Sequence, residues 1–75
     1  MNTFNRLLMD ATHLYFSAEW NYDAFVKAQK LQDRVYSARN NNNITNDEYK
    51  ALNPLVNHLI DEMRAELKRQ RRKEA

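Results

Sequence analysis

The 75-residue chain contains no glycine, no cysteine and only one proline. Glycine supplies the positive φ angles of tight hairpins and of phosphate-binding loops, so its absence argues against β-hairpins and against a glycine-rich nucleotide loop. The lack of cysteine excludes disulfides and thiolate metal sites, and it fits a reducing compartment. No apolar run approaches the roughly 18 residues that span a membrane, and residues 1–9 lack the pattern of a secretory signal. We therefore expect a cytoplasmic protein with no membrane partner.

Residues that favour helices are plentiful, among them alanine, leucine, glutamate, lysine, arginine, glutamine and methionine. A domain of this size buries only about 60% of the surface that its unfolded chain exposes. Small domains often rely on a disulfide, a metal or a partner chain, and without cysteine the expected source of extra stability is self-association. The sequence predicts a single all-α domain over residues 1–75, either a three-helix bundle or a long helical hairpin, completed by dimerisation.

The first half of the chain carries two apolar stripes at helical spacing, which predict helices over residues 3–16 and 19–39. The first stripe comprises Phe4, Leu7, Leu8, Ala11, Leu14 and Tyr15, and the second comprises Ala24, Phe25, Ala28, Leu31 and Val35. Ser17 is a good N-cap for the second helix, so we expect a break near this residue. A heptad pattern also runs through the junction from Phe4 to Phe25, and one continuous helix over 3–39 is the alternative.

Four consecutive asparagines at positions 40–43 predict a turn, because asparagine tolerates the left-handed backbone found at helix ends. Thr45 and Glu48 follow with the spacing of a capping box, which predicts the start of a third helix over 46–72. Its apolar stripe comprises Tyr49, Leu52, Val56, Leu59, Met63 and Leu67, widened by Leu55 and Ile60. Pro54 either begins a fresh helix behind Asn53 or kinks a continuous one.

Charge is distributed unevenly along the chain. Residues 1–63 carry six basic and eight acidic side chains, whereas residues 64–75 carry six basic and two acidic ones. Cations at a helix C-terminus are favoured by the helix dipole, so residues 68–75 can be a solvated helix end. The alternative is a nucleic-acid-binding tail, in which the basic side chains contact phosphates. Its candidate residues are Lys68, Arg69, Arg71, Arg72 and Lys73.

Five of the eight aromatic residues lie within positions 15–25. If this segment is helical, Phe16 and Trp20 share one stripe, and Tyr15, Tyr22 and Phe25 share another. Both stripes can be buried in the core. The alternative is a partner-binding surface formed by Trp20, Phe16 and Tyr22, since tryptophan and tyrosine are enriched in interface hot spots.

Catalytic chemistry finds little support in the residue pattern. The only serines are Ser17 and Ser37, and neither stands in register with a histidine as a nucleophile pair. If the first and third helices packed together, His13 with Asp10 and His58 with Glu62 could approach a metal site, but ordinary surface pairs are the favoured interpretation. We expect no enzyme activity, no cofactor and no metal.

The asparagine-rich turn and the helix start that follows it, Ile44-Thr45-Asn46-Asp47-Glu48-Tyr49, resemble helical hairpins of small phage and mobile-element proteins. The resemblance covers residues 40–49, and it implies a phage or mobile-element origin and a hairpin more than an activity. We expect a small non-enzymatic regulatory or inhibitory protein that acts through protein–protein contacts, with a homodimer as one form. Nucleic-acid binding through the basic C-terminal helix end is the alternative.

Overall fold

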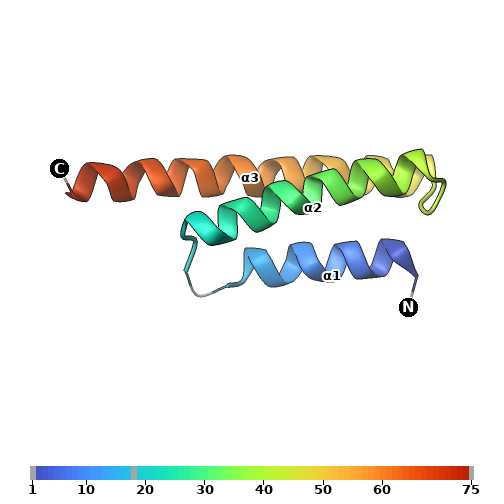
Figure 1. Ribbon diagram of the computed structural model, residues 1–75, viewed down its shortest axis with the longest axis horizontal. Coiled ribbons are helices and arrows are strands. Elements are labelled where there is room, and N and C mark those ends of the chain that lie inside the picture. The colour runs from blue at the N-terminus through green and yellow to red at the C-terminus, as the bar shows by residue number, and fades with distance from the viewer. Residues whose placement is uncertain (1, 18, 75) are drawn as a thin grey trace.

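The computed structural model describes residues 2–17 and 19–74. Three helices, α1 (Thr3–Tyr15), α2 (Tyr22–Asn40) and α3 (Asn46–Glu74), form the described part of the chain, which contains no strand. The predicted all-α class is therefore confirmed. The helices run up, down and up again beside one another in a body of 46 × 19 × 16 Å, and α2 makes its most extensive contact with α3 (Figure 1).

The break between the first two helices is wider than predicted, because α2 begins at Tyr22 instead of residue 19. Its N-cap is Asn21, whose side-chain oxygen accepts a hydrogen bond from the backbone N–H of Ala24 at 3.0 Å. Ser17 is not the cap; its hydroxyl donates to the Leu14 carbonyl at 2.8 Å, at the end of α1. One continuous helix over 3–39 is therefore wrong, because two separate cap structures interrupt the heptad pattern.

The turn between α2 and α3 has the predicted chemistry. Asn42 adopts φ 59°, the left-handed conformation that asparagine tolerates better than other residues with a side chain. The capping box is fully formed: the Glu48 amide donates to the Thr45 hydroxyl at 3.1 Å, and the Thr45 amide donates to the Glu48 carboxylate at 2.8 Å. These bonds satisfy two donors that a helix start leaves unpaired.

Pro54 lies inside α3, which continues as one helix of 29 residues. The fresh start behind Asn53 is therefore wrong. At 1.5 Å per residue a helix of this length extends about 43 Å, so α3 is much longer than α1 and α2. Its C-terminal end projects past the first turn of α2 (Figure 1).

The core closes within one chain. All three helices and the turn before α3 contribute to it, and the buried residues are Leu7, Ala11, Ala24, Ala28, Leu31, Val35, Ala38, Ile44, Leu52, Val56, Leu59, Ile60 and Met63. Four alanines among them allow the helices to approach closely. The three apolar stripes thus pack against one another, with Phe4, Leu8, Leu14 and Phe25 partly buried at the edge of the core. Leu55, predicted to widen the core stripe of α3, is instead 43% exposed.

None of the helices in the described ranges combines the length and apolar character of a membrane-spanning segment.

Candidate functional site

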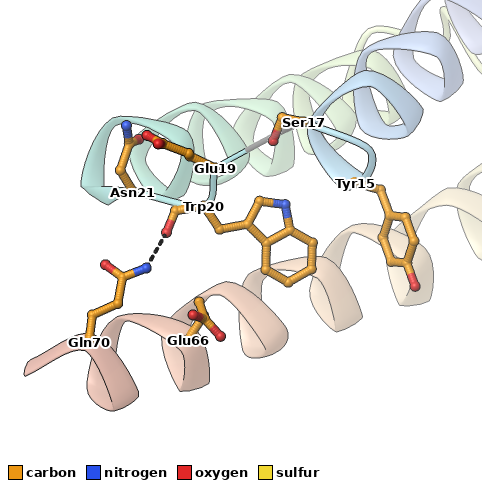
Figure 2. A pocket seen from close by; sticks show the side chains of 7 residues that line it. All are labelled: Tyr15, Ser17, Glu19, Trp20, Asn21, Glu66 and Gln70. Carbon is orange, nitrogen blue, oxygen red and sulfur yellow. Dashed lines mark hydrogen bonds between the residues drawn. The ribbon is translucent and has the colours of Figure 1, made fainter. Parts of the chain in front are cut away.

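Trp20 fastens the α1–α2 connection to the rest of the bundle. Its indole N–H donates to the Leu14 carbonyl at 3.0 Å, and its ring meets the Tyr15 ring edge-on at 5.9 Å. Its backbone carbonyl accepts a hydrogen bond from the Gln70 side chain of α3 at 3.3 Å, and the indole projects between the connection and α3 (Figure 2). The ring is partly buried against the core. Trp20 thus anchors the α1–α2 connection, and only part of its surface is accessible to solvent.

Phe16 and Tyr22, the other two candidate partner-binding residues, are the most exposed aromatic side chains in the described ranges. Phe16 is 76% exposed and Tyr22 is 68% exposed. The predicted shared stripe of Phe16 and Trp20 is wrong, because Phe16 caps the end of α1 and Trp20 lies outside any helix. The structure also separates the two exposed rings: Phe16 borders a groove between α1 and α3, whereas Tyr22 borders a groove between α2 and α3.

The groove between α1 and α3, called here the α1–α3 groove, is a hollow of about 320 Å³ with an almost entirely apolar lining. It is lined by Ala11, Thr12, Tyr15, Phe16, Leu55, His58 and Leu59. Tyr15 is 48% exposed beside it, with its ring 5.1 Å from the ring of Phe16. Contiguous exposed apolar surface is a feature of interaction sites, and the groove joins the exposed side chains of Tyr15, Phe16 and Leu55, so it is the first candidate for a binding surface.

The outer side of α1 continues the groove and bears no charge. Asn5, Met9, Thr12 and Phe16 follow one another at spacings of four, three and four residues, which places them on one side of the helix. Met9 is 44% exposed there. This side was not predicted from the sequence, although four uncharged residues at helical spacing are a signal that identifies it.

The charged residues of α1 lie on its other flank, toward α2. Asp10 accepts a hydrogen bond from Arg34 of α2 at 2.8 Å, and both line a hollow that also contains His13, Lys27 and Lys30. This division of charge leaves the outer side of α1 uncharged and gives the α1–α2 side a polar rim.

The two histidine–carboxylate pairs do not converge. His13 and Asp10 face the α1–α2 hollow, whereas His58 borders the α1–α3 groove and lies 3.9 Å from Glu62 one turn along α3. Among the residues that the structure describes, no three metal-binding side chains cluster together. Packing of α1 against α3 therefore does not assemble the four-ligand arrangement considered from the sequence.

The basic tail is divided among different surroundings. Lys68 and Arg71 lie with Tyr22 and Phe25 in the groove between α2 and α3. Two further candidates differ: Arg69 forms an ion pair with Glu66, and Arg72 is exposed near the helix end. The side chain of the fifth candidate, Lys73, lies outside the described part of the structure. Arg64, which sequence reasoning did not select, joins Lys68 and Arg71 because it lies one and two turns before them on the same helix.

Comparison of the chain with models of protein families, with curated proteins and with solved structures gave no match.

Proposed function

We propose that this protein is a small non-enzymatic regulator or inhibitor that acts by docking its α1–α3 groove onto another protein. The observation that carries the proposal is the position of Phe16, a phenylalanine 76% exposed at the edge of an apolar groove on the uncharged side of α1. Apart from its edge-on contact with Tyr15, the Phe16 ring faces water, whereas a partner that covers it would remove the ring from water.

The energetic contribution of Phe16 is large for one residue. Aromatic side chains bury about 150–250 Å² each, so covering the exposed part of this ring removes roughly 150 Å² from water. At about 25 cal/mol per Å² this corresponds to nearly 4 kcal/mol before the entropy of ordering is subtracted. Phe16 thus has the size and exposure of an interface hot spot.

The partner surface that fits best is one side of an amphipathic helix. The groove lies between two helices, and helices bind such grooves through apolar residues three and four positions apart. A helix laid there would make a fourth member of the bundle, packed against Met9, Phe16 and Leu55. Because the outer side of α1 carries no charge, the residues of that helix that face α1 are expected to be uncharged as well. A second copy of the chain, which supplies its own α1, is one such partner.

The test compares two highly exposed aromatic residues that border different grooves. Phe16→Ser removes the proposed anchor, and Tyr22→Ser is the matched control because Tyr22 is also highly exposed but borders the α2–α3 groove. Proteins from the organism that encodes the chain are captured on both variants and on the unmodified protein. Candidates retained by Tyr22→Ser but lost from Phe16→Ser are purified and titrated by calorimetry.

We expect a purified partner whose dissociation constant rises at least tenfold with Phe16→Ser and changes less than twofold with Tyr22→Ser. Leu55→Ser should weaken the same complex, because Leu55 lines the opposite wall of the groove. Sedimentation of the unmodified protein alone tests whether the partner is a second copy. If every purified partner binds all three proteins with equal affinity and the chain is strictly monomeric, the proposal is wrong.

A further inference from the structure

A second surface, on the other side of α3, combines aromatic rings with cations at both of its ends. At one end Tyr22 and Phe25 lie 6.5 Å apart, and the Arg64 guanidinium sits 5.8 Å from the centre of the Phe25 ring. At the other end Tyr36 and Tyr49 lie 6.0 Å apart, and the Arg39 guanidinium sits 4.5 Å from the centre of the Tyr49 ring. Each cluster contains residues from both α2 and α3, which form the two sides of the α2–α3 groove.

The two clusters belong to one continuous face. In α2, residues 22, 25, 29, 32, 36 and 39 are three or four positions apart, which keeps them on one side of the helix. Gln32 and Asn57 hydrogen bond across the middle of the groove and join the two halves. The clusters are 14 residues apart along α2, which corresponds to about 21 Å. We call this surface the α2–α3 face.

The charge of the α2–α3 face is positive, although the chain as a whole has a net charge of only +2. Lys68 and Arg71 lie beside Tyr22 and Phe25 and extend the cluster toward the C-terminal end of α3. Asp61 stands next to Arg64, at 3.6 Å, and offsets part of that charge. Arg39 supplies the cation at the far end. Each end of the face thus combines cations with aromatic rings, and the neutral Gln32 and Asn57 side chains lie between the two ends.

We infer that the α2–α3 face binds single-stranded nucleic acid, with bases stacked on Tyr22 and Tyr36 and phosphates held by Lys68, Arg71 and Arg39. Sequence-tolerant single-strand sites combine these two elements, an aromatic platform for the bases and a positive groove for the backbone. A duplex hides the faces of its bases, so exposed rings such as Tyr22 would gain nothing from it. An acidic protein would pair with the cations but has no flat base faces to stack on the rings, so its binding would not depend on aromatic stacking.

The surface is independent of the α1–α3 groove. Tyr22 and Tyr36 are 68% and 42% exposed and lie on the α2 side of α3, whereas Phe16 borders the α1 side. Both functions can therefore be lost separately, and failure of one leaves the other intact. The span of about 21 Å suits a short stretch of strand, at the lower end of the roughly 4–16 nucleotides that small single-strand modules cover.

The experiment measures binding of a fluorescein-labelled twelve-nucleotide oligothymidine by anisotropy over a series of salt concentrations. Tyr22→Leu removes the ring but keeps an apolar side chain at an exposed position, so the fold should be retained. Loss of one stacking contact should raise the dissociation constant about five- to a hundredfold. Phe16→Leu is the matched control on the other groove and should leave binding unchanged.

Two double variants test whether binding depends on the position of the positive charges or only on the net charge of the protein. Lys68→Gln with Arg71→Gln removes two cations from the α2–α3 face, and Lys27→Gln with Lys30→Gln removes two from the α1–α2 hollow. Each phosphate contact on a single strand contributes about −0.7 to the slope of log K against log salt. The first double variant should therefore flatten that slope by about 1.4, and the second should leave it nearly unchanged.

Three results would overturn the inference. The first is no binding of the oligonucleotide by the unmodified protein at 100 μM and low salt. The second is an equal effect of the two double variants, which would show attraction to net charge alone. The third is displacement of the strand by polyglutamate as effectively as by unlabelled oligothymidine, together with no effect of Tyr22→Leu, because an acidic partner needs no stacking ring. Weaker binding of a duplex of the same length would support it.

Discussion

Replacing Leu59 with alanine should destabilise the fold more than any surface change on α3. The Leu59 side chain is 1% exposed and lies under α1, where its neighbour across the interface is the fully buried Ala11. The methyl side chain of Ala11 is fixed to its backbone and cannot move into the space that the truncation leaves. Leucine-to-alanine changes in cores cost 2–5 kcal/mol, and we expect about 3 kcal/mol because the adjacent α1–α3 groove lets some neighbours relax.

That cost is a large part of the total stability. A domain of this length has an unfolding free energy of about 4–11 kcal/mol, and each kcal/mol shifts its melting temperature by roughly 4–8 °C. Leu59→Ala should therefore melt at least about 12 °C below the unmodified protein. Urea unfolding followed by far-ultraviolet circular dichroism gives the free energy directly, with an m value of about 1 kcal/mol/M placing the midpoint shift near 3 M.

Leu55→Ala is the matched control, one turn away on the same helix but 43% exposed. We expect a cost of about 1 kcal/mol or less, because much of this side chain is in water already. If Leu55→Ala and Leu59→Ala gave equal shifts, α3 would have to be rotated about its axis relative to the orientation described above, and the α1–α3 groove would be lined by other residues.

Three further changes test the local structure. Thr45→Ala should cost about 1 kcal/mol in urea unfolding through loss of the helix cap, and a cost above that of Leu59→Ala would contradict the register of α3. Asn42→Ala should cost about 1 kcal/mol because of the left-handed backbone, whereas Asn42→Gly should be close to neutral; equal costs would show that the side chain matters for another reason. Trp20→Ala should lower stability by roughly 2 kcal/mol, about half the cost for a fully buried ring, measured by circular dichroism because the only tryptophan is removed. An unchanged melting curve would make Trp20 a free surface residue.

The helical class and the turn between α2 and α3 could be predicted from the sequence because their signals are local. Thr45 and Glu48 are three residues apart, so their hydrogen bonds form as soon as the first turn of α3 forms. The left-handed backbone at Asn42 likewise depends on the residue itself and not on distant contacts. The apolar stripe of α3 was also readable, since periodicity places most of its members on one side of the helix.

The corner between α1 and α2 could not be predicted in the same way. Ser17 and Asn21 are both good caps in isolation, and the choice between them depends on where Trp20 finds a carbonyl partner and a packing surface. That packing surface is formed by α1 and α3 together, so it cannot be inferred from the residues of the α1–α2 connection alone. The helical stripe expected for Phe16 and Trp20 failed because the tertiary contacts of Trp20 favour a non-helical connection.

For the candidate surfaces, too, some features follow from the local sequence and others depend on tertiary packing. The sequence by itself determined that aromatic residues gather near positions 15–25 and cations near the C-terminal end. Only the tertiary structure decided that Phe16 borders an apolar groove on one side of α3, while Tyr22 joins Lys68 and Arg71 on the other. The physical reason is that a local pattern fixes which side of its own helix a residue occupies, whereas the neighbour it meets depends on how whole helices pack, and packing is governed by core residues far apart in the chain.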